Sequence, residues 1–233
     1  MLSIKIYYIC ILFVIIAFTA FSVKADYTAG LIAYKNENYT KAYKEWIPLA
    51  RSGNADAQVF IGKLYFSGKG VQQNIEEATK WYDLAVGQNN STGQFLLGSI
   101  YENGIGVPID KNRAYQLYQD AAKQGHAEAQ FRLGVILFKG TIVERNYIKA
   151  AEMYMNAAEQ GLMVAQTNLA GMYALGLGLD RDLVLAYSWF TLAIKQGSER
   201  AQENLNFMVD RMTEEQITRA NQLVNNWTTQ NQK

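Results

Sequence analysis

The chain has almost none of the residues on which most catalytic and metal sites depend. It contains one cysteine, Cys10, and one histidine, His126. Cys10 lies in the first 25 residues, so removal of that segment would leave no thiol for a disulfide, a nucleophile or a metal ion. His126 follows Gly125 at the expected start of a helix, a place that favours a solvated or capping side chain over a catalytic base. The sequence therefore predicts no catalytic residue and no metal-ligand cluster.

The remaining candidate motifs also fail to indicate catalysis or a bound cofactor. Two adjacent acidic pairs, Glu76–Glu77 and Glu214–Glu215, fall in expected first turns of helices, where acidic side chains complement the helix dipole. Gly68 and Gly70 form a Gly-x-Gly, but no strand precedes them and no third glycine follows in the dinucleotide-binding spacing. We expect no cofactor.

Proline is scarce and charge is balanced. Only Pro48 and Pro108 occur, so long helices run with little interruption. Lysine and arginine total 22 against 21 acidic residues, and loss of Lys5 and Lys24 with the first 25 residues would turn the net charge from +1 to −1. This balance predicts no nucleic-acid partner. Hydrophobic residues at 49% and charged residues at 18% indicate a folded protein rather than a disordered one.

Residues 1–25 have the pattern of a secretory signal. Lys5 gives a positive start, residues 6–21 are almost all apolar, and Val23 and Ala25 stand at the third-last and last positions. This order predicts export, to the periplasm or out of the cell, with cleavage after Ala25. The alternative is an uncleaved membrane anchor, although an apolar run of this length is shorter than the ~20 residues that span a bilayer.

A period of 36 residues governs the rest of the chain. Five sets of positions follow it: glutamine at 58, 94, 130, 166 and 202; alanine at 42, 78, 114, 150 and 186; an aromatic residue at 82, 118, 154 and 190; alanine at 85, 121, 157 and 193; and glycine at 68, 104, 140 and 176. Agreement of independent positions at one spacing predicts stacked helical repeats.

Each repeat reads as two helices joined by a glycine-rich loop. In residues 54–88, Ala57, Ile61 and Leu64 share one helical face, and Gly68 ends that helix. Four side chains stand at the expected N-cap of the second helix, one per repeat: Asn74, Asp110, Asn146 and Asp182. Small residues at 62, 98, 134 and 170 let the paired helices approach, and we expect the large aromatic residues to fill the gaps between hairpins.

These patterns predict an all-α fold, a solenoid (α-α superhelix) of stacked hairpins. After the signal at 1–25, residues 26–53 form a hairpin with a shorter turn, and 54–197 form four repeats. Residues 198–233 form closing helices and a polar tail that frays from Asn225. Thr213 and Gln216 have the spacing of a capping box for the last helix.

The repeats resemble the Sel-one-like repeat, a longer-looped relative of the tetratricopeptide repeat. The resemblance rests on Ala-x-x-Gln (55–58, 127–130), Gly-x-Gly-Val (68–71, 104–107) and Ala-Ala-x-x-Gly (121–125, 157–161), and it covers residues 54–197. It implies a bacterial scaffold for protein complexes, often exported and sometimes active in envelope processes or host interaction. Residues 26–53 have the tetratricopeptide spacing instead.

Two departures from the family pattern affect what is carried over. Residues 140–143 read Gly-Thr-Ile-Val and lose the second loop glycine, so we expect a distorted loop there. Some relatives carry a cysteine pair in every repeat and have been linked to β-lactam binding or hydrolysis. This chain lacks those cysteines, and we do not expect that activity.

The first helices of a solenoid line its concave face, where positions that vary between repeats are free to suit a partner. Three such stripes begin at Val59, Lys63 and Phe66 and continue at 36-residue steps. The predicted partner-binding residues are Val59, Lys63, Phe66, Phe95, Glu102, Phe131, Val135 and Phe138. The alternative is that the phenylalanine rings pack between adjacent first helices and belong to the core.

The sequence thus predicts an exported, non-enzymatic adaptor that binds a protein or peptide and meets a membrane only through an uncleaved signal. Two rival functions remain: an enzyme or ligand-binding protein acting on cell-wall peptides, and a membrane-anchored assembly factor.

Overall fold

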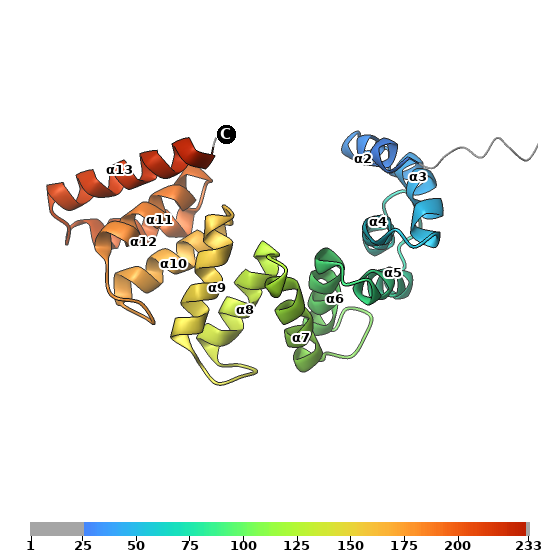
Figure 1. Cartoon of the computed structure of the whole chain (residues 1–233), viewed down its shortest axis with the longest axis horizontal. Helices are drawn as coiled ribbons and strands as arrows, with labels where there is room; N and C mark the ends of the chain where they lie inside the picture. Colours follow the sequence, from blue (N-terminus) through green and yellow to red (C-terminus); the bar gives the residue numbers. More distant parts are fainter. Residues whose placement is uncertain (1–25, 232–233) are drawn as a thin grey trace, which may run out of the picture. The chain divides into compact units, whose positions relative to one another are not determined.

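The computed structural model describes residues 26–231, and within that range all regular structure is α-helical (Figure 1). The proposed signal at 1–25 and its cleavage site therefore lie outside the described residues. The helices are α2 (Tyr27–Lys35), α3 (Tyr39–Arg51), α4 (Ala55–Ser67), α5 (Ile75–Gly87), α6 (Ser91–Asn103), α7 (Lys111–Lys123), α8 (Ala127–Lys139), α9 (Tyr147–Glu159), α10 (Met163–Leu175), α11 (Leu183–Lys195), α12 (Glu199–Val209) and α13 (Glu214–Asn231).

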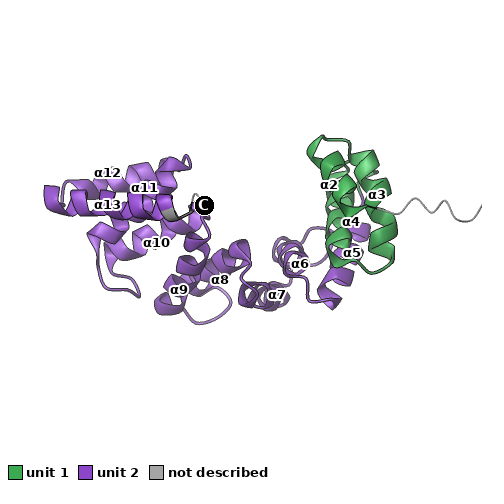
Figure 2. Cartoon of the chain, turned by 45° about the horizontal axis from the view of Figure 1, so that its top comes forward, with its two compact units in different colours: residues 1–73 green, residues 74–233 purple. Residues whose placement is uncertain are grey.

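The helices fall into two compact units, coloured separately in Figure 2. Unit 1 ends at Gln73 and contains α2 to α4, in which α3 packs against both neighbours. Unit 2 begins at Asn74 and contains α5 to α13. In unit 2 each helix from α5 to α11 packs against the next one along the chain, and α13 packs against α11. The prediction of an all-α fold of stacked hairpins is confirmed.

The ends of the repeat helices follow the chemistry expected from the sequence. The side chains of Asn74, Asp110, Asn146 and Asp182 each accept a hydrogen bond from the backbone N–H three residues later. The glycines at 68, 104, 140 and 176 end the first helices with φ of 68°, a left-handed conformation that glycine adopts without steric cost.

The loop that lacks its second glycine departs from the others at one residue. Gly70, Gly106 and Gly178 have φ between 70° and 73°, whereas Ile142, at the same place in its loop, is not among the residues with positive φ. The loop still closes in the same way, because the N–H of Asn146 donates to the carbonyl of Leu137 as Asp110 does to Tyr101. The expected distortion is thus confined to the backbone around Ile142.

Small residues on the first helices make room for one aromatic side chain per hairpin. A Cβ on Gly98 would lie 2.8 Å from Tyr118, and one on Gly134 would lie 2.7 Å from Tyr154. Unit 1 repeats the arrangement, since a Cβ on Gly30 would lie 2.2 Å from Trp46. All three aromatic side chains are buried. The paired helices therefore approach closely because the glycines carry no side chain.

The periodic glutamines form hydrogen bonds that join successive repeats. The buried amides of Gln130 and Gln166 donate to the carbonyls of Ala122 and Ala158, at the end of the preceding helix. Each also accepts a hydrogen bond from a glutamine 30 residues later, Gln160 and Gln196 respectively. Because a buried amide without partners is costly, these hydrogen bonds account for glutamine at the two positions.

The C-terminal residues close unit 2. The Thr213 hydroxyl accepts from the Gln216 N–H, and the Gln216 side chain accepts from the Thr213 N–H, which confirms the predicted capping box. The expected fraying from Asn225 was wrong: α13 continues to Asn231, and its Trp227 ring lies 6.2 Å from that of Trp189 on α11. Within residues 26–231, no helix combines the length and apolar character that crossing a bilayer requires.

Candidate functional site

A groove of about 660 Å³ lies on unit 2, between the side chains of α8, α10 and α12. Helices α8 and α10 are the first helices of consecutive hairpins, and α12 follows the second of these hairpins (Figure 1). The residues that line the groove are Phe131, Arg132, Val135, Phe138, Lys139, Tyr154, Thr167, Asn168, Gly171, Met172, Ala174, Leu175, Leu177, Arg181, Leu183, Phe190, Arg200, Asn204, Phe207, Met208 and Arg211.

The groove is hollow where α10 carries a glycine. Gly171 stands at the helix position that is Val135 one period earlier and Phe207 one period later. A Cβ built on Gly171 would meet no atom within 4 Å, unlike the Cβ atoms that would clash at Gly98 and Gly134. No packing requirement therefore explains this glycine, and its missing side chain leaves space in the groove.

Aromatic side chains from the second helices form the floor. Tyr154 of α9 and Phe190 of α11 are buried and line the groove from below. Burial raises the pKa of the Tyr154 hydroxyl to about 12, although a hydrogen bond with Asn168 and the charge of Arg200 both act in the opposite direction. The Tyr154 hydroxyl is therefore neutral at physiological pH, and the floor carries no charge.

Two large apolar side chains at the edge are exposed to solvent. Leu175, the last residue of α10, is 70% exposed, and Phe207 of α12 is 82% exposed. Burying such a side chain yields about 1.5–3 kcal/mol, so both can contribute to binding another molecule. The groove thus offers an apolar floor and apolar edges.

The charges around the groove have one sign. Arg132, Lys139, Arg181, Arg200 and Arg211 line it, whereas none of the described lining residues is Asp or Glu. The Arg181 guanidinium is fixed by a hydrogen bond of 3.1 Å from its Nε to the carbonyl oxygen of Ala174. The Arg132 guanidinium lies 4.0 Å from the carboxylate of Glu102 on α6.

Three of the predicted partner-binding residues meet in this groove. Phe131, Val135 and Phe138 form its α8 wall, and each is partly buried against the core of unit 2. The Phe131 ring lies 5.8 Å from that of Tyr154, and the Phe138 ring lies 5.2 Å from that of Tyr147. Phe131 and Phe138 therefore contact aromatic residues of the second helix α9 and also line the groove.

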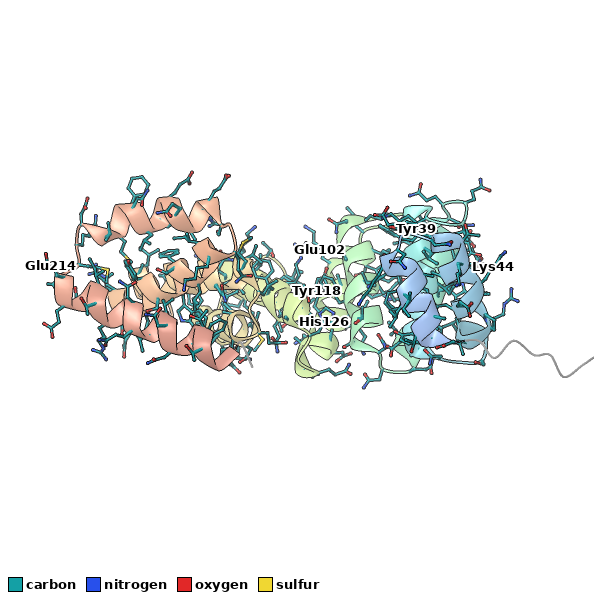
Figure 3. All side chains as sticks on the ribbon, turned by 90° about the horizontal axis from the view of Figure 1, so that it is seen from above. Tyr39, Lys44, Glu102, Tyr118, His126 and Glu214 are labelled. Atoms are coloured by element: carbon teal, nitrogen blue, oxygen red, sulfur yellow. The ribbon has the colours of Figure 1, made fainter. Side chains whose placement is uncertain are left out.

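Phe95 and Glu102 lie on α6 and interact within the protein. The Phe95 ring stacks on His126, with centroids 4.9 Å apart, and the Nδ1 of His126 accepts the N–H of Ala129 as the N-cap of α8. The Tyr118 hydroxyl donates to a Glu102 oxygen at 2.7 Å (Figure 3 labels both residues). Burial, together with this carboxylate, raises the pKa of Tyr118. Glu102 thus anchors a buried tyrosine.

The other three predicted residues belong to α4 in unit 1. Val59 is only 3% exposed, so it is part of the core and a partner has no access to its side chain. It was predicted at the surface because the stripe was placed by mapping the tetratricopeptide pattern onto the repeats. The Lys63 amine lies 5.2 Å from the Phe60 ring centroid, and the Phe66 carbonyl accepts a hydrogen bond from the Gln73 amide. Lys63 and Phe66 are partly exposed.

Sequence reasoning missed the α12 side of the groove. Arg200 and Phe207 lie on this helix and Arg211 follows its end, and the helix was interpreted as part of the closing pair rather than as another first helix. The signal was present in the sequence, because one further 36-residue step from Val135 and Gly171 reaches Phe207. The same step from Lys139 and Leu175 reaches Arg211.

The side chains of the groove can bind a ligand through apolar contacts and hydrogen bonds. In the part of the chain that the structure describes, no three or more His, Cys, Asp or Glu side chains gather where they could hold a metal ion. The single histidine serves as a helix cap, away from the groove-lining residues. The groove itself offers guanidinium groups, amides and apolar surface, which recognise a ligand but provide no nucleophile paired with a base.

Comparison with known proteins identifies the repeats. A family model described as the Sel1 repeat matches residues 55–90, 91–126, 127–162 and 164–198, which together make up more than half of the chain. The comparison with curated proteins returned no match.

Several solved bacterial structures are similar to this chain. A Sel1 repeat protein from Oxalobacter formigenes is 32% identical over 72% of the chain, with a TM-score of 0.69. A protective antigen of uropathogenic Escherichia coli with this fold, c5321, is 29% identical over 81% of the chain, with a TM-score of 0.54. The matched region is 48% of each of those two proteins, so the chain spans about half their length. A protein from Klebsiella pneumoniae, 21% identical over 78% of this chain and 91% of its own, shares the fold with a TM-score of 0.51.

Proposed function

Because the chain belongs to the Sel1 repeat family, we propose that it is a non-catalytic scaffold that binds a segment of another protein in the groove between α8, α10 and α12. Helical-repeat proteins bind partners on extended faces made by equivalent helices of successive repeats. The groove occupies such a face, since α8 and α10 are first helices of successive hairpins and α12 packs against α10.

The observation that carries this proposal is the exposed apolar surface around a hollow. Leu175 and Phe207 stand in solvent beside a groove whose floor is aromatic, although no packing need of unit 2 places them there. Clusters of large apolar side chains with arginines are typical of the centres of protein interfaces. A groove with an aromatic floor and exposed apolar edges is suited to bind one apolar side chain of a partner.

A pair of substitutions at Gly171 tests the proposal. Gly171→Phe places a ring in the hollow on a Cβ that meets no atom within 4 Å, and Gly171→Ala adds a single methyl group at the same place. The two variants and the parent protein are immobilised and exposed to an envelope extract of the organism that encodes the chain. Partners identified by mass spectrometry should be recovered by the parent and by Gly171→Ala but lost with Gly171→Phe, while the three circular dichroism spectra agree. Recovery of one set of partners by all three proteins would exclude the groove as the binding site.

We further propose that the protein is exported and that residues 1–25 are removed, a proposal that rests on Lys5, the apolar run and Ala25 alone. The intact mass of the protein purified from its own cells decides between this proposal and a membrane-anchored assembly factor. A mass equal to that of residues 26–233 supports export with cleavage, and the mass of the whole chain supports the anchor.

The groove dimensions also support a second candidate, a receptor or enzyme for cell-wall peptides. A volume of about 660 Å³ lies within the range of small-ligand pockets, and Thr167, Asn168 and Asn204 supply polar groups. Soluble peptidoglycan peptides should then raise the melting temperature of the parent protein but not that of Gly171→Phe. Cleavage products in the same mixture, detected by chromatography, would indicate the enzyme.

A further inference from the structure

The cations around the groove have few carboxylates to neutralise them within the protein. Among the ion pairs between described residues, Arg132 is the only groove cation involved, through Glu102. Lys139, Arg181, Arg200 and Arg211 have no carboxylate within 4 Å in the part of the chain that the structure describes. Their charges are therefore available to attract an anionic partner.

This concentration of positive charge is local. The chain as a whole has 22 basic and 21 acidic residues, yet the groove lining contains five basic residues and no acidic one. Three acidic residues on or next to α12, Glu199, Glu203 and the C-cap Asp210, are exposed but do not line the groove. A charge distribution of this kind raises the association rate of an oppositely charged ligand and discriminates against a ligand of like charge.

One of the arginines is held in place before any partner binds. The Arg181 Nε donates to the Ala174 carbonyl, which leaves four of the five donors of the guanidinium for other acceptors. Arg200 lies near enough to Tyr154 for its charge to lower the pKa of that hydroxyl. Arginine forms paired hydrogen bonds with carboxylates, so guanidinium groups beside an apolar hollow favour a ligand that carries both an apolar side chain and carboxylates.

We propose that the partner of this groove is an acidic peptide segment in which one large apolar side chain enters the hollow over Gly171 while flanking Asp or Glu carboxylates pair with Arg181, Arg200 and Arg211. This inference rests on the proposed function and specifies the chemistry of the partner. A peptide fits better than a nucleic acid, because the floor is buried and apolar and only Phe207 offers an exposed aromatic face for stacking a base.

The experiment begins with selection of random peptides of about 12 residues, displayed on phage, on the purified protein at low salt. Phage that also bind Gly171→Phe are removed. We expect the recovered peptides to combine an aromatic or leucine residue with an excess of Asp and Glu. A fluorescein-labelled copy of one recovered peptide is then titrated with the protein, and its fluorescence anisotropy gives the dissociation constant.

Charge variants test the role of the arginines in that titration. Arg200→Glu and Arg211→Glu should each weaken binding about 10-fold, because each replaces an attraction with a repulsion. Lys149→Glu makes the same change of charge on the exposed face of α9, outside the groove lining, and should leave the dissociation constant within about twofold. Raising NaCl from about 50 to about 300 mM should weaken binding to the parent roughly 10-fold through screening.

The outcomes separate this inference from the proposed function. Recovered peptides without an acidic excess that still fail to bind Gly171→Phe would overturn the acidic partner and leave the groove as a peptide site. The acidic partner and the groove as a peptide site would both be overturned if every phage that binds the parent also binds Gly171→Phe. The same holds if no phage binds the parent. A 20-nucleotide single-stranded oligo(dT) that binds more tightly than the selected peptide and displaces it would overturn the peptide in favour of a nucleic acid.

Discussion

At the scale of single residues, the repeated glutamine shows why a polar side chain recurs in a helical core. Gln130 donates to the carbonyl of Ala122 in the preceding hairpin and accepts from Gln160 in its own. Each glutamine thus makes a contact that depends on the stacking of two hairpins. Replacement of Gln130 by an apolar residue would remove both hydrogen bonds. The side-chain amide of Gln160 would then lose its buried acceptor.

Gln130→Leu should therefore lower the free energy of unfolding by about 2 kcal/mol, because the lost hydrogen bonds outweigh the added apolar contact. Urea denaturation followed by circular dichroism measures the effect. Gln116→Leu, on the exposed face of α7, is the control and should change the free energy of unfolding by less than about 0.5 kcal/mol. Equal effects of the two substitutions would contradict the structural role of the buried amide.

Two glycines at different positions of the first helices should respond to alanine in opposite ways. A Cβ on Gly98 lies 2.8 Å from Tyr118, so Gly98→Ala forces the helices apart and should destabilise unit 2 by about 1–3 kcal/mol. A Cβ on Gly171 meets nothing within 4 Å, and alanine is the better helix former by about 1 kcal/mol. Gly171→Ala should therefore raise the melting temperature. A lower melting temperature for this variant would show that the glycine has a packing role.

At the scale of the element, capping fixes where each second helix begins. Asn146 accepts from the N–H of Lys149 at the start of α9, and its counterparts do the same in the other repeats. Helix α10 is different, because its N-cap Leu162 makes no side-chain hydrogen bond and instead contacts the core of unit 2. The start of α10 depends on packing where its neighbours depend on a polar cap.

Asn146→Ala should cost about 1 kcal/mol of stability, the usual effect of removing a side-chain cap. Asn146→Asp retains the acceptor and should keep the stability within about 0.5 kcal/mol of the parent. Thermal unfolding of the three proteins under identical conditions measures the differences. If aspartate fails to restore what alanine loses, the side-chain acceptor is not the source of the effect.

At the scale of the whole molecule, stability is the sum of contacts between neighbouring helices. Each hairpin of unit 2 packs on the next, and α12 and α13 both cover α11. Buried tyrosines take part in this packing in successive hairpins, and burial raises the pKa of both Tyr118 and Tyr154. A raised pKa means that the folded state holds the phenolic proton more tightly than the unfolded state.

The free energy of unfolding should therefore fall as the pH rises above 10. For Tyr154 the ordinary pKa of 10.0 rises to about 12, so its stabilising effect is complete below pH 10 and is lost between pH 10 and 12. The loss amounts to roughly 2–3 kcal/mol, by the free energy equivalent of a pKa difference. Urea denaturation at pH 9, 10 and 11 should show a shallower decline for Tyr154→Phe than for the parent. Parallel declines would indicate that Tyr154 does not ionise on unfolding.

The sequence by itself determined the repeat and therefore the fold. A 36-residue period in glutamine, alanine, aromatic and glycine positions was enough to predict the helix ends, the caps at Asn74, Asp110, Asn146 and Asp182, and the tight approach at Gly98 and Gly134. These features depend on local backbone chemistry and on contacts that every repeat makes in the same way. A pattern that recurs can be recognised without coordinates.

Only the tertiary structure decided which of the variable positions reach solvent together. Val59 and Phe131 stand at equivalent sequence positions, yet Val59 is buried and Phe131 lines the groove. Glu102 was predicted to face a partner, but it accepts a hydrogen bond from Tyr118. Whether a side chain is exposed depends on the sizes of its neighbours from other helices. Gly171 is an example, because Val135 and Phe207 occupy the same position one period earlier and one period later. Spacing along one helix carries no information about those neighbours.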